Sequence, residues 1–235
     1  MNFKFGKVLL ASALVVGLSS ASMAGMKGSN EATEKKGKSE TSMAVSQLLL
    51  AGQLVDYGMA KRDPIPLITA AKITKGIEIE ESNHKAETTQ DGAAGTAKKT
   101  AGPAKPKTSD EILAIAREYA GGKAEVLAMI TDVEEEDSRG RTRGPGRICT
   151  KVNSRSSDTY KIKFRGEEQA IIGVRGDGDT DLDLFVYDEN NNRICSDTDG
   201  TDRMVCAWTP AWTGKFKVKV KNLGSVFNRY CLLTN

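Results

Sequence analysis

The sequence has few of the side chains that build enzyme active sites and metal centres. His84 is the only histidine among 235 residues, and it lies in a polar stretch of the chain. The cysteines all lie from residue 149 onward, at Cys149, Cys195, Cys206 and Cys231. No two of them are spaced as Cys-x-x-Cys, so a zinc site is not expected. A Ser–His–Asp or Cys–His arrangement in this part of the chain is not expected either, and we predict a protein that is not an enzyme.

Charge of one sign and long apolar runs are also scarce. The net charge is only +3, which does not indicate a nucleic-acid-binding protein. The apolar run at residues 8–18 is too short for a transmembrane helix, and it follows Lys4 and Lys7. With small residues at 22–24, this pattern predicts a signal peptide over residues 1–24. We therefore expect an exported protein, periplasmic or extracellular, that does not span a membrane after cleavage.

The start of the mature chain is predicted to be flexible and then helical. Residues 25–42 are small and polar, which is typical of a flexible N-terminus. Residues 43–75 carry apolar side chains at helical spacing. Asp63 before Pro64 suits the cap and first position of a second helix. This segment is therefore predicted to be a helical hairpin.

A second helical hairpin is predicted over residues 109–137. Thr108 and Glu111 at its start have the spacing of a capping box. Before it, residues 76–108 are rich in Ala, Gly, Thr and Lys, which predicts a disordered linker. After it, residues 138–146 form a basic Gly/Pro linker. Whether the two hairpins form one domain stays open at this point, as does an oligomer formed through them.

From residue 147 to residue 235 the apolar period changes to two. Phe216, Val218 and Val220 alternate with lysines, and similar alternation recurs between turn residues throughout this segment. Several short alternating strands separated by turns predict a β-sandwich.

The even number of cysteines in an exported chain indicates two disulfides. Three connectivities can be drawn. Cys195 and Cys206 flank a short acidic loop, whereas Cys149 and Cys231 lie at the two ends of the β segment. We therefore predict a Cys195–Cys206 pair and a Cys149–Cys231 pair.

Four stretches of the β segment resemble a known family. They read DTYKIKF at 158–164, GDGDTDLDLFVYD at 176–188, WTPAWTGKFKVKV at 208–220 and YCLL at 230–233. Together they are similar to the bacterial pre-peptidase C-terminal domain. The resemblance implies a secreted, jelly-roll-like β-sandwich, often attached to proteases and collagenases. No peptidase lies upstream, so that role is not carried over, and the predicted fold class is α+β, with a small N-terminal helical region followed by the sandwich.

An acidic cluster begins in the predicted turn at residues 176–179. Its members are Asp177, Asp179, Asp181, Asp183 and Asp188. Calcium takes about six to eight oxygen ligands, which carboxylates on neighbouring loops can supply, and some members of the resembled family bind calcium. Against this, aspartate and glycine also favour turns for local reasons. We keep a calcium site as a prediction, with turn formation as its alternative and no cofactor as certain.

Four aromatic side chains are candidates for ligand binding. Phe185 and Tyr187 are expected to share one face of a strand, and Trp208 and Trp212 flank Pro210. Exposed aromatic rings beside carboxylates can stack on sugar rings or on a peptide. The alternative, which we favour for the tryptophans, is that they fill one end of the sandwich core.

A lysine stripe is also present, at Lys215, Lys217, Lys219 and Lys221. One strand would present these ammonium groups on one face, where they could meet an anionic polymer or lipid head groups. Lysines on an edge strand also prevent edge-to-edge association. We favour the edge-strand interpretation.

Together these features predict an exported, non-enzymatic binding or accessory module. Its partner would be an extracytoplasmic protein or polysaccharide, with calcium as a candidate cofactor and nucleic acid not expected. The alternative is a structural protein of the cell envelope whose helices mediate assembly. A hydrolase that uses aspartates is the third function considered, and it has the least support because the aspartates lie together on one short segment.

Overall fold

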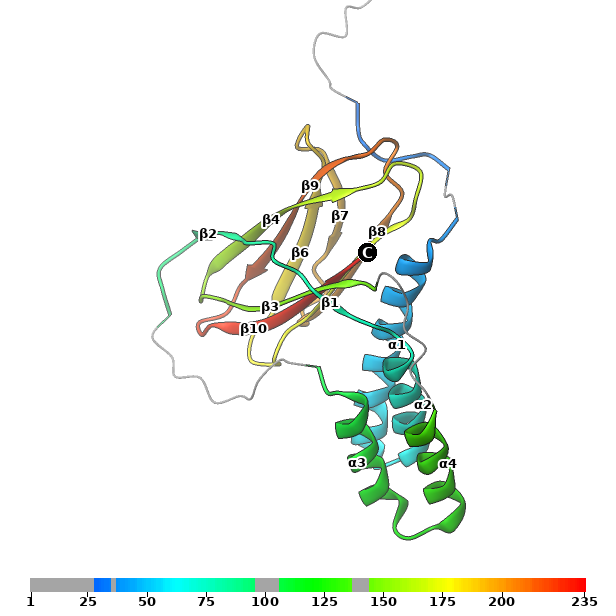
Figure 1. Cartoon of the computed structure of the whole chain (residues 1–235). Coiled ribbons are helices and arrows are strands. Elements are labelled where there is room, and N and C mark those ends of the chain that lie inside the picture. Colours follow the sequence, from blue (N-terminus) through cyan, green and yellow to red (C-terminus); the bar gives the residue numbers. More distant parts are fainter. Residues whose placement is uncertain (1–27, 35–36, 96–105, 137–143) are drawn as a thin grey trace, which may run out of the picture.

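The computed structural model describes residues 28–34, 37–95, 106–136 and 144–235. Within these ranges the chain forms four helices and ten strands, arranged as a helical bundle beside a two-sheet sandwich (Figure 1). The predicted order, a helical region followed by a β-sandwich, is confirmed. The predicted signal peptide at residues 1–24 lies outside the described residues, as does most of the predicted linker at 138–146.

The first helical hairpin consists of α1 (Glu40–Lys61) and α2 (Pro64–Lys75). The side chain of Ser39 caps α1 by accepting a hydrogen bond from the Ser42 amide. The Asp63 side chain does the same for α2 by accepting from the Ile65 amide. Pro64 occupies the first turn, where its missing amide hydrogen has no helical partner to lose.

The second hairpin consists of α3 (Ser109–Ala120) and α4 (Ala124–Glu135). The capping box predicted for Thr108 and Glu111 is present with both of its hydrogen bonds. Leu67 and Ala71 of α2 share one buried cluster with Leu113 of α3 and Ile130 of α4. The two hairpins therefore form a single bundle, because neither has enough apolar surface for a core of its own.

The sandwich consists of two five-stranded sheets, here named sheet A and sheet B. In spatial order, the strands of sheet A are β1 (Glu80–Glu81), β3 (Gly146–Val152), β10 (Asn228–Thr234), β5 (Ala170–Arg175) and β8 (Arg203–Trp208). Those of sheet B are β2 (Glu87–Gln90), β4 (Ser156–Phe164), β9 (Gly214–Asn222), β6 (Leu182–Tyr187) and β7 (Arg193–Asp197). Alternate side chains point inward, so that Phe216, Val218 and Val220 of β9 are fully buried.

The predicted linker at residues 76–108 is wrong for its first half. Within it, β1 pairs in parallel with β3, and β2 pairs in antiparallel fashion with β4. One short segment thus contributes an edge strand to each sheet. Both strands are exposed and polar, because they join through backbone hydrogen bonds and bury almost no side chain. Their apolar content therefore could not reveal them. Residues 96–105 lie outside the described part.

The predicted flexible N-terminus at residues 25–42 is also wrong where the chain is described. Asn30 is fully buried, and its amide donates to the Asp188 carboxylate over 2.9 Å. The amide of Ala32 donates to the carbonyl of Thr209 over 2.8 Å. Polar residues hold this segment against the sandwich, which explains why a hydrophobicity pattern missed it.

Both predicted disulfides are confirmed. Cys149 and Cys231 are directly paired across β3 and β10 and are bonded to each other. Cys195 of β7 is bonded to Cys206 of β8. Since β7 and β8 are edge strands of different sheets, this second disulfide joins the two sheets on the side opposite β1 and β2.

The helical bundle contacts the outer side of sheet A through α1 (Figure 1). Gly173 of β5 makes this approach close, because a Cβ at this position would overlap the Leu49 side chain of α1. Ala44 and Leu48 of α1 add a small apolar cluster with Leu233 packed against it. The outer side of sheet B lies on the far side of the sandwich from this contact.

Candidate functional site

β9 is the middle strand of sheet B, with β4 on one side and β6 on the other. The interpretation of its four lysines as protection of an edge strand is therefore wrong. Lysines alternate with apolar residues in the same way on a central strand and on an edge strand. The sequence pattern therefore could not predict the position of β9 in the sheet. The lysines point away from the core, since Phe216, Val218 and Val220 between them are fully buried.

Two further lysines join the stripe from β4. Lys161 lies directly opposite Lys217, and Lys163 lies directly opposite Lys215. The six residues of this lysine face are Lys161, Lys163, Lys215, Lys217, Lys219 and Lys221. The two lysines of β4 were not among the residues predicted from the sequence, although they alternate with the buried Tyr160, Ile162 and Phe164 in the same way. Like charges directly opposite on antiparallel strands destabilise a sheet.

An aromatic pair adjoins the lysine face on β6. The rings of Phe185 and Tyr187 are stacked, with centroids 6.4 Å apart and planes 24° apart. Phe185 lies opposite Lys219, and Tyr187 lies opposite Lys217. Both aromatic side chains are half-buried, so one side of each remains accessible. This placement agrees with the predicted shared face and puts the rings within the array of ammonium groups.

Two carboxylates accompany these lysines. Glu87 of β2 forms a 2.9 Å ion pair with Lys161, and this hydrogen bond and charge lower the pKa of Glu87. Asp183 of β6 lies opposite Lys221 and is 9 % exposed. Burial raises the pKa of Asp183, and the charge of Asp181 adds to this effect, while Lys221 opposes it. The lysine face therefore keeps an excess of positive charge.

The two tryptophans have different positions. Trp208 is buried in the core, where its ring meets Phe164 edge-on at 4.9 Å and Phe216 at 5.2 Å. Its ligand-binding role is therefore wrong, and the core-filling alternative is confirmed. Trp212 is 43 % exposed, and its indole nitrogen donates to Glu189 over 2.5 Å. The favoured core-filling role is therefore wrong for Trp212, which remains a candidate contact.

The structure separates the five aspartates that the sequence grouped. Asp183 lies on the outer side of sheet B, as described above. Asp188 lies at the other end of β6, where it is fully buried and accepts hydrogen bonds from the amides of Asn30, Asn190 and Asn192. Those hydrogen bonds outweigh the effect of burial and lower the pKa of Asp188. Asp188 thus organises a turn and holds the N-terminal segment. This position agrees with turn formation, the alternative to a calcium site.

The remaining three aspartates lie in the loop between β5 and β6. Asp177 accepts hydrogen bonds from the amides of Arg229 and Asp179. Asp179 and Asp181 line a polar hollow of about 430 Å³ together with Asp202 of the facing loop. Within the described residues, no three or more acidic, histidine or cysteine side chains are grouped so that they could hold a metal ion. A calcium site stays a prediction from the sequence.

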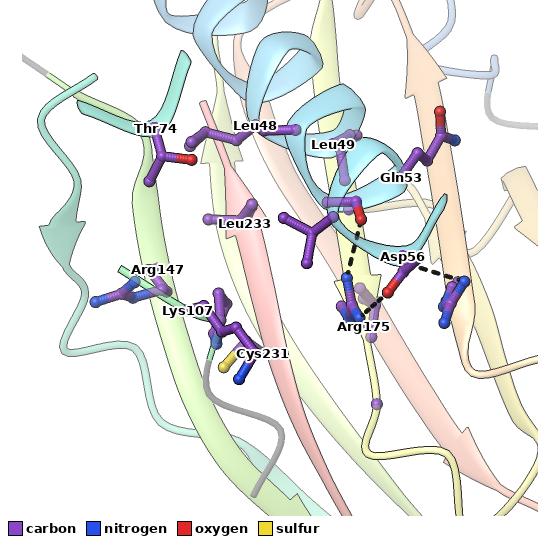
Figure 2. Close-up of a pocket in the computed structure, with 18 of the residues that line it drawn as sticks. Leu48, Leu49, Gln53, Asp56, Thr74, Lys107, Arg147, Arg175, Cys231 and Leu233 are labelled. Carbon is purple, nitrogen blue, oxygen red and sulfur yellow. Dashed lines mark hydrogen bonds and ion pairs between the residues drawn. The ribbon is translucent and has the colours of Figure 1, made fainter. Parts of the chain in front are cut away.

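A larger cavity, of about 680 Å³, lies between α1, the start of α3 and the outer side of sheet A. Figure 2 shows Leu48 and Leu49 on its helix side and Leu233 on its sheet side. Arg175 and Asp56 lie at its polar end. The cavity is thus part of the junction between the bundle and the sandwich.

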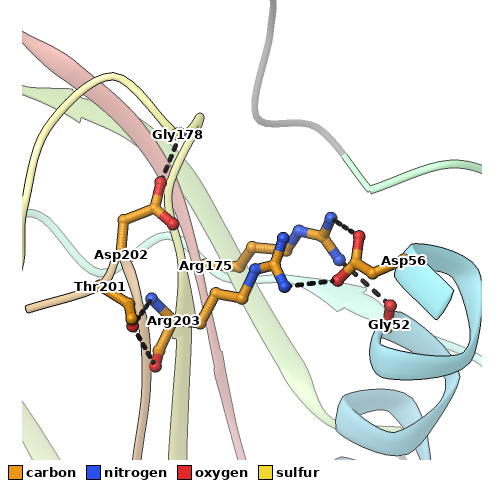
Figure 3. A network of polar contacts seen from close by, with 7 residues as sticks. All are labelled: Gly52, Asp56, Arg175, Gly178, Thr201, Asp202 and Arg203. Atoms are coloured by element: carbon orange, nitrogen blue, oxygen red, sulfur yellow. Dashed lines mark hydrogen bonds and ion pairs between the residues drawn. The ribbon is translucent and has the colours of Figure 1, made fainter. Parts of the chain in front are cut away.

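Two arginines hold this junction together (Figure 3). Arg175 of β5 contacts one oxygen of Asp56 over 2.6 Å, and Arg203 of β8 contacts the other over 3.0 Å. Arg175 also donates to the carbonyl of Gly52 over 3.4 Å. The structure thus pairs both arginines with a residue of α1. Asp56 was not predicted as a functional residue, because no local sequence pattern indicates that an aspartate pairs with residues of distant strands.

The single histidine lies in the exposed loop between β1 and β2, where its Nδ1 contacts the hydroxyl of Ser82 over 2.7 Å. Among the described helices, none combines the length and the apolar character that crossing a membrane requires.

Comparisons with known proteins give only partial alignments with solved structures. No protein-family model matches the chain, and no curated protein sequence does. Among solved structures, the pre-peptidase C-terminal domain of a Bacillus anthracis collagenase aligns with 14 % identity and a TM-score of 0.32, over 38 % of this chain and 87 % of that one. The Aeromonas hydrophila periplasmic inhibitor of g-type lysozyme aligns with 12 % identity and a TM-score of 0.30, over 39 % and 84 %.

A third alignment is with a carbohydrate-binding module, CBM36, solved with calcium and xylotriose. It has 11 % identity and a TM-score of 0.25, over 41 % of this chain and 89 % of that one. At these scores the alignments assign neither a family nor a ligand to this chain. The resemblance to the pre-peptidase C-terminal domain therefore stays a prediction from the sequence.

Proposed function

We propose that this chain is an exported, non-enzymatic binding module that uses the lysine face and the Phe185–Tyr187 pair to bind an acidic polysaccharide. The observation that carries the proposal is the direct opposition of Lys161 to Lys217 and of Lys163 to Lys215. Such pairs weaken a sheet by themselves. The acidic groups of a bound polyanion would attract these lysines and offset their mutual repulsion. The arrangement is therefore suited to binding a polyanion.

The spacing of the lysine face suits a linear polymer. Alternate residues along a strand are about 6.6 Å apart and neighbouring strands about 4.8 Å apart. The ammonium groups therefore form a two-dimensional array on the long strands β4 and β9, each nine residues in length. Long flexible lysine side chains can adjust to acidic groups at several repeats.

The aromatic pair is what favours a polysaccharide over other polyanions. Phe185 and Tyr187 present half-buried rings directly beside Lys217 and Lys219. A flat aromatic ring offers an apolar surface against which a sugar ring can pack, while the neighbouring ammonium groups take its acidic substituents.

Export supports a ligand outside the cytoplasm. The two disulfides, Cys149–Cys231 and Cys195–Cys206, indicate an oxidising compartment. The predicted signal peptide agrees with them. An envelope or extracellular polysaccharide is therefore available to this surface, and calcium assistance remains part of the proposal.

Binding to polygalacturonate, with neutral dextran as comparison, tests this function. We expect polygalacturonate to bind at low salt, with an affinity that falls as salt rises, and dextran to bind much more weakly. The double variant Lys217→Ser, Lys219→Ser should lose at least about tenfold in affinity, equivalent to about 1.4 kcal/mol. Phe185→Ser should weaken polygalacturonate binding without changing the salt dependence. Repeating the titration with excess calcium and then with EDTA tests calcium assistance.

The matched control changes the same net charge on the helical bundle. Lys72 pairs with Glu136 on the bundle surface, and Lys123 is exposed before α4. The double variant Lys72→Ser, Lys123→Ser should bind polygalacturonate as the parent does. If it loses affinity equally, binding reflects net charge only and the proposed surface is wrong. Binding to vesicles of anionic lipid, but not to polygalacturonate, would also overturn the proposal.

A further inference from the structure

The outward side of α1 carries an apolar stripe. Met43, Leu50 and Tyr57 are 43 %, 48 % and 55 % exposed. They are spaced by seven residues, which is close to two helical turns, so they lie on one face of the helix. Gln47 and Gln53 are exposed beside them. The opposite side of α1 is already covered by α2, β5 and β10.

Charge is absent from this face over most of the helix. The only charged residues of α1 are Glu40 at its start, Lys61 at its end and Asp56. Asp56 points to the sandwich, where Arg175 and Arg203 bind it (Figure 3). A helix face in contact with water normally carries charged side chains. The uncharged face therefore resembles a surface that another helix covers.

The stripe is complementary to itself when reversed. In an antiparallel pair of α1 helices centred on Leu50, Met43 of each copy meets Tyr57 of the other. Gln47 meets Gln53, where two amide side chains can exchange hydrogen bonds. These pairings follow from the sequence positions, which are placed symmetrically about Leu50 in α1.

The two charged ends of α1 fit the same arrangement. Reversal about Leu50 brings Glu40 of one copy beside Lys61 of the other, twice in the pair. A parallel pair would instead place glutamate beside glutamate and lysine beside lysine. Antiparallel packing also sets the positive end of each helix dipole beside the negative end of its neighbour.

We infer that α1 binds α1 of a second copy of this chain, antiparallel, across a two-fold axis at Leu50. Such an interface is isologous, the kind found in most closed dimers. This inference does not rest on polysaccharide binding. A dimer would also carry two lysine faces, which would raise the avidity for a repeating polymer.

Sedimentation of the purified exported protein over a range of concentrations tests the dimer. We expect twice the monomer mass for the parent. Leu50→Glu should give the monomer mass, because it sets two carboxylates against each other on the axis. Met129→Glu is the matched control, since Met129 of α4 is also 42 % exposed but lies outside the stripe. A monomeric parent, or a Leu50→Glu variant that stays dimeric, overturns the inference.

Engineered cysteines test the orientation. All four native cysteines are held in disulfides, so an added cysteine would be the only thiol. Leu50→Cys should form a covalent dimer on mild oxidation. Met43→Cys alone should not, whereas an equal mixture of Met43→Cys and Tyr57→Cys proteins should form the mixed dimer. Efficient cross-linking of Met43→Cys with itself would show parallel packing and overturn the antiparallel arrangement.

Discussion

Lys163 on β4 and Lys215 on β9 lie directly opposite each other on the outer side of sheet B. Both side chains are exposed, and Lys161 and Lys217 repeat the arrangement two residues along. A glutamate at one of these positions would have formed a favourable cross-strand pair. The sandwich instead concentrates positive charge on two adjoining strands of one sheet, although the whole chain has a net charge of only +3.

Removing this repulsion should stabilise the protein in the absence of ligand. We expect Lys215→Thr to raise the free energy of unfolding by about 0.2–1 kcal/mol at low salt. The gain should shrink as added salt screens the charges. Urea unfolding at two ionic strengths measures both effects.

A double-mutant cycle serves as the control. Lys163→Thr should give a similar gain, and the two substitutions together should give less than the sum, because either one removes the same repulsion. Strictly additive gains would mean that Lys163 and Lys215 do not interact.

A second prediction concerns the contact between the bundle and the sandwich. Gly173→Ala places a methyl group where Leu49 lies, so we expect it to lower the free energy of unfolding by about 1–3 kcal/mol. Leu49→Ala in the same chain should recover part of this loss by making room. The measurement is urea unfolding of both single variants and the double variant. If the double variant simply sums the two losses, α1 does not pack on β5 as described.

Local patterns were enough to predict most of the individual elements. The Thr108–Glu111 capping box and the alternation at Phe216, Val218 and Val220 depend only on neighbouring residues. The disulfide pairs could also be predicted, because Cys195 and Cys206 flank one short loop.

Strand order and long-range polar contacts could not be predicted in this way. The position of β9 in the middle of sheet B depends on β4 and β6, which are distant in sequence. The exposed edge strand β2 is polar and carries no alternation. Asn30 and Asp56 bind partners more than a hundred residues away through polar groups that hydrophobicity does not register. The lysine face and the helix contact were therefore visible only in the fold.

A third prediction concerns the two disulfides, which close loops of very different length. They join residues separated by 82 positions in Cys149–Cys231 and by 11 in Cys195–Cys206. Loop-closure entropy then gives about 4.5 kcal/mol for the first and about 2.8 kcal/mol for the second. We expect Cys149→Ala, Cys231→Ala to lower the melting temperature more than Cys195→Ala, Cys206→Ala. The reverse order would mean that the link between β7 and β8 acts mainly in the folded state, by holding the two sheets together.

The aspartates at the two ends of β6 have pKa values shifted in opposite directions. Hydrogen bonds from Asn30, Asn190 and Asn192 outweigh burial and lower the pKa of Asp188. Burial and the charge of Asp181 raise the pKa of Asp183 despite Lys221. The ionised form of Asp188 therefore stabilises the fold, whereas that of Asp183 opposes it.

These shifts predict opposite effects of the same substitution. Asp188→Asn should lower the free energy of unfolding at pH 7 by about 1–3 kcal/mol, because an NH2 group replaces one of the two carboxylate oxygens that accept from buried donors. Since the pKa of Asp188 is lowered in the fold, its stabilisation is present above the ordinary aspartate pKa of about 3.9 and is lost as the pH falls through the lower native value. The deficit of the variant should therefore shrink below about pH 4. Asp183→Asn should instead raise stability at pH 7, and its gain should vanish as the pH falls through the raised native pKa. Urea unfolding from pH 7 downward measures both, and a deficit of Asp188→Asn that stays constant with pH would show that packing rather than charge makes Asp188 important.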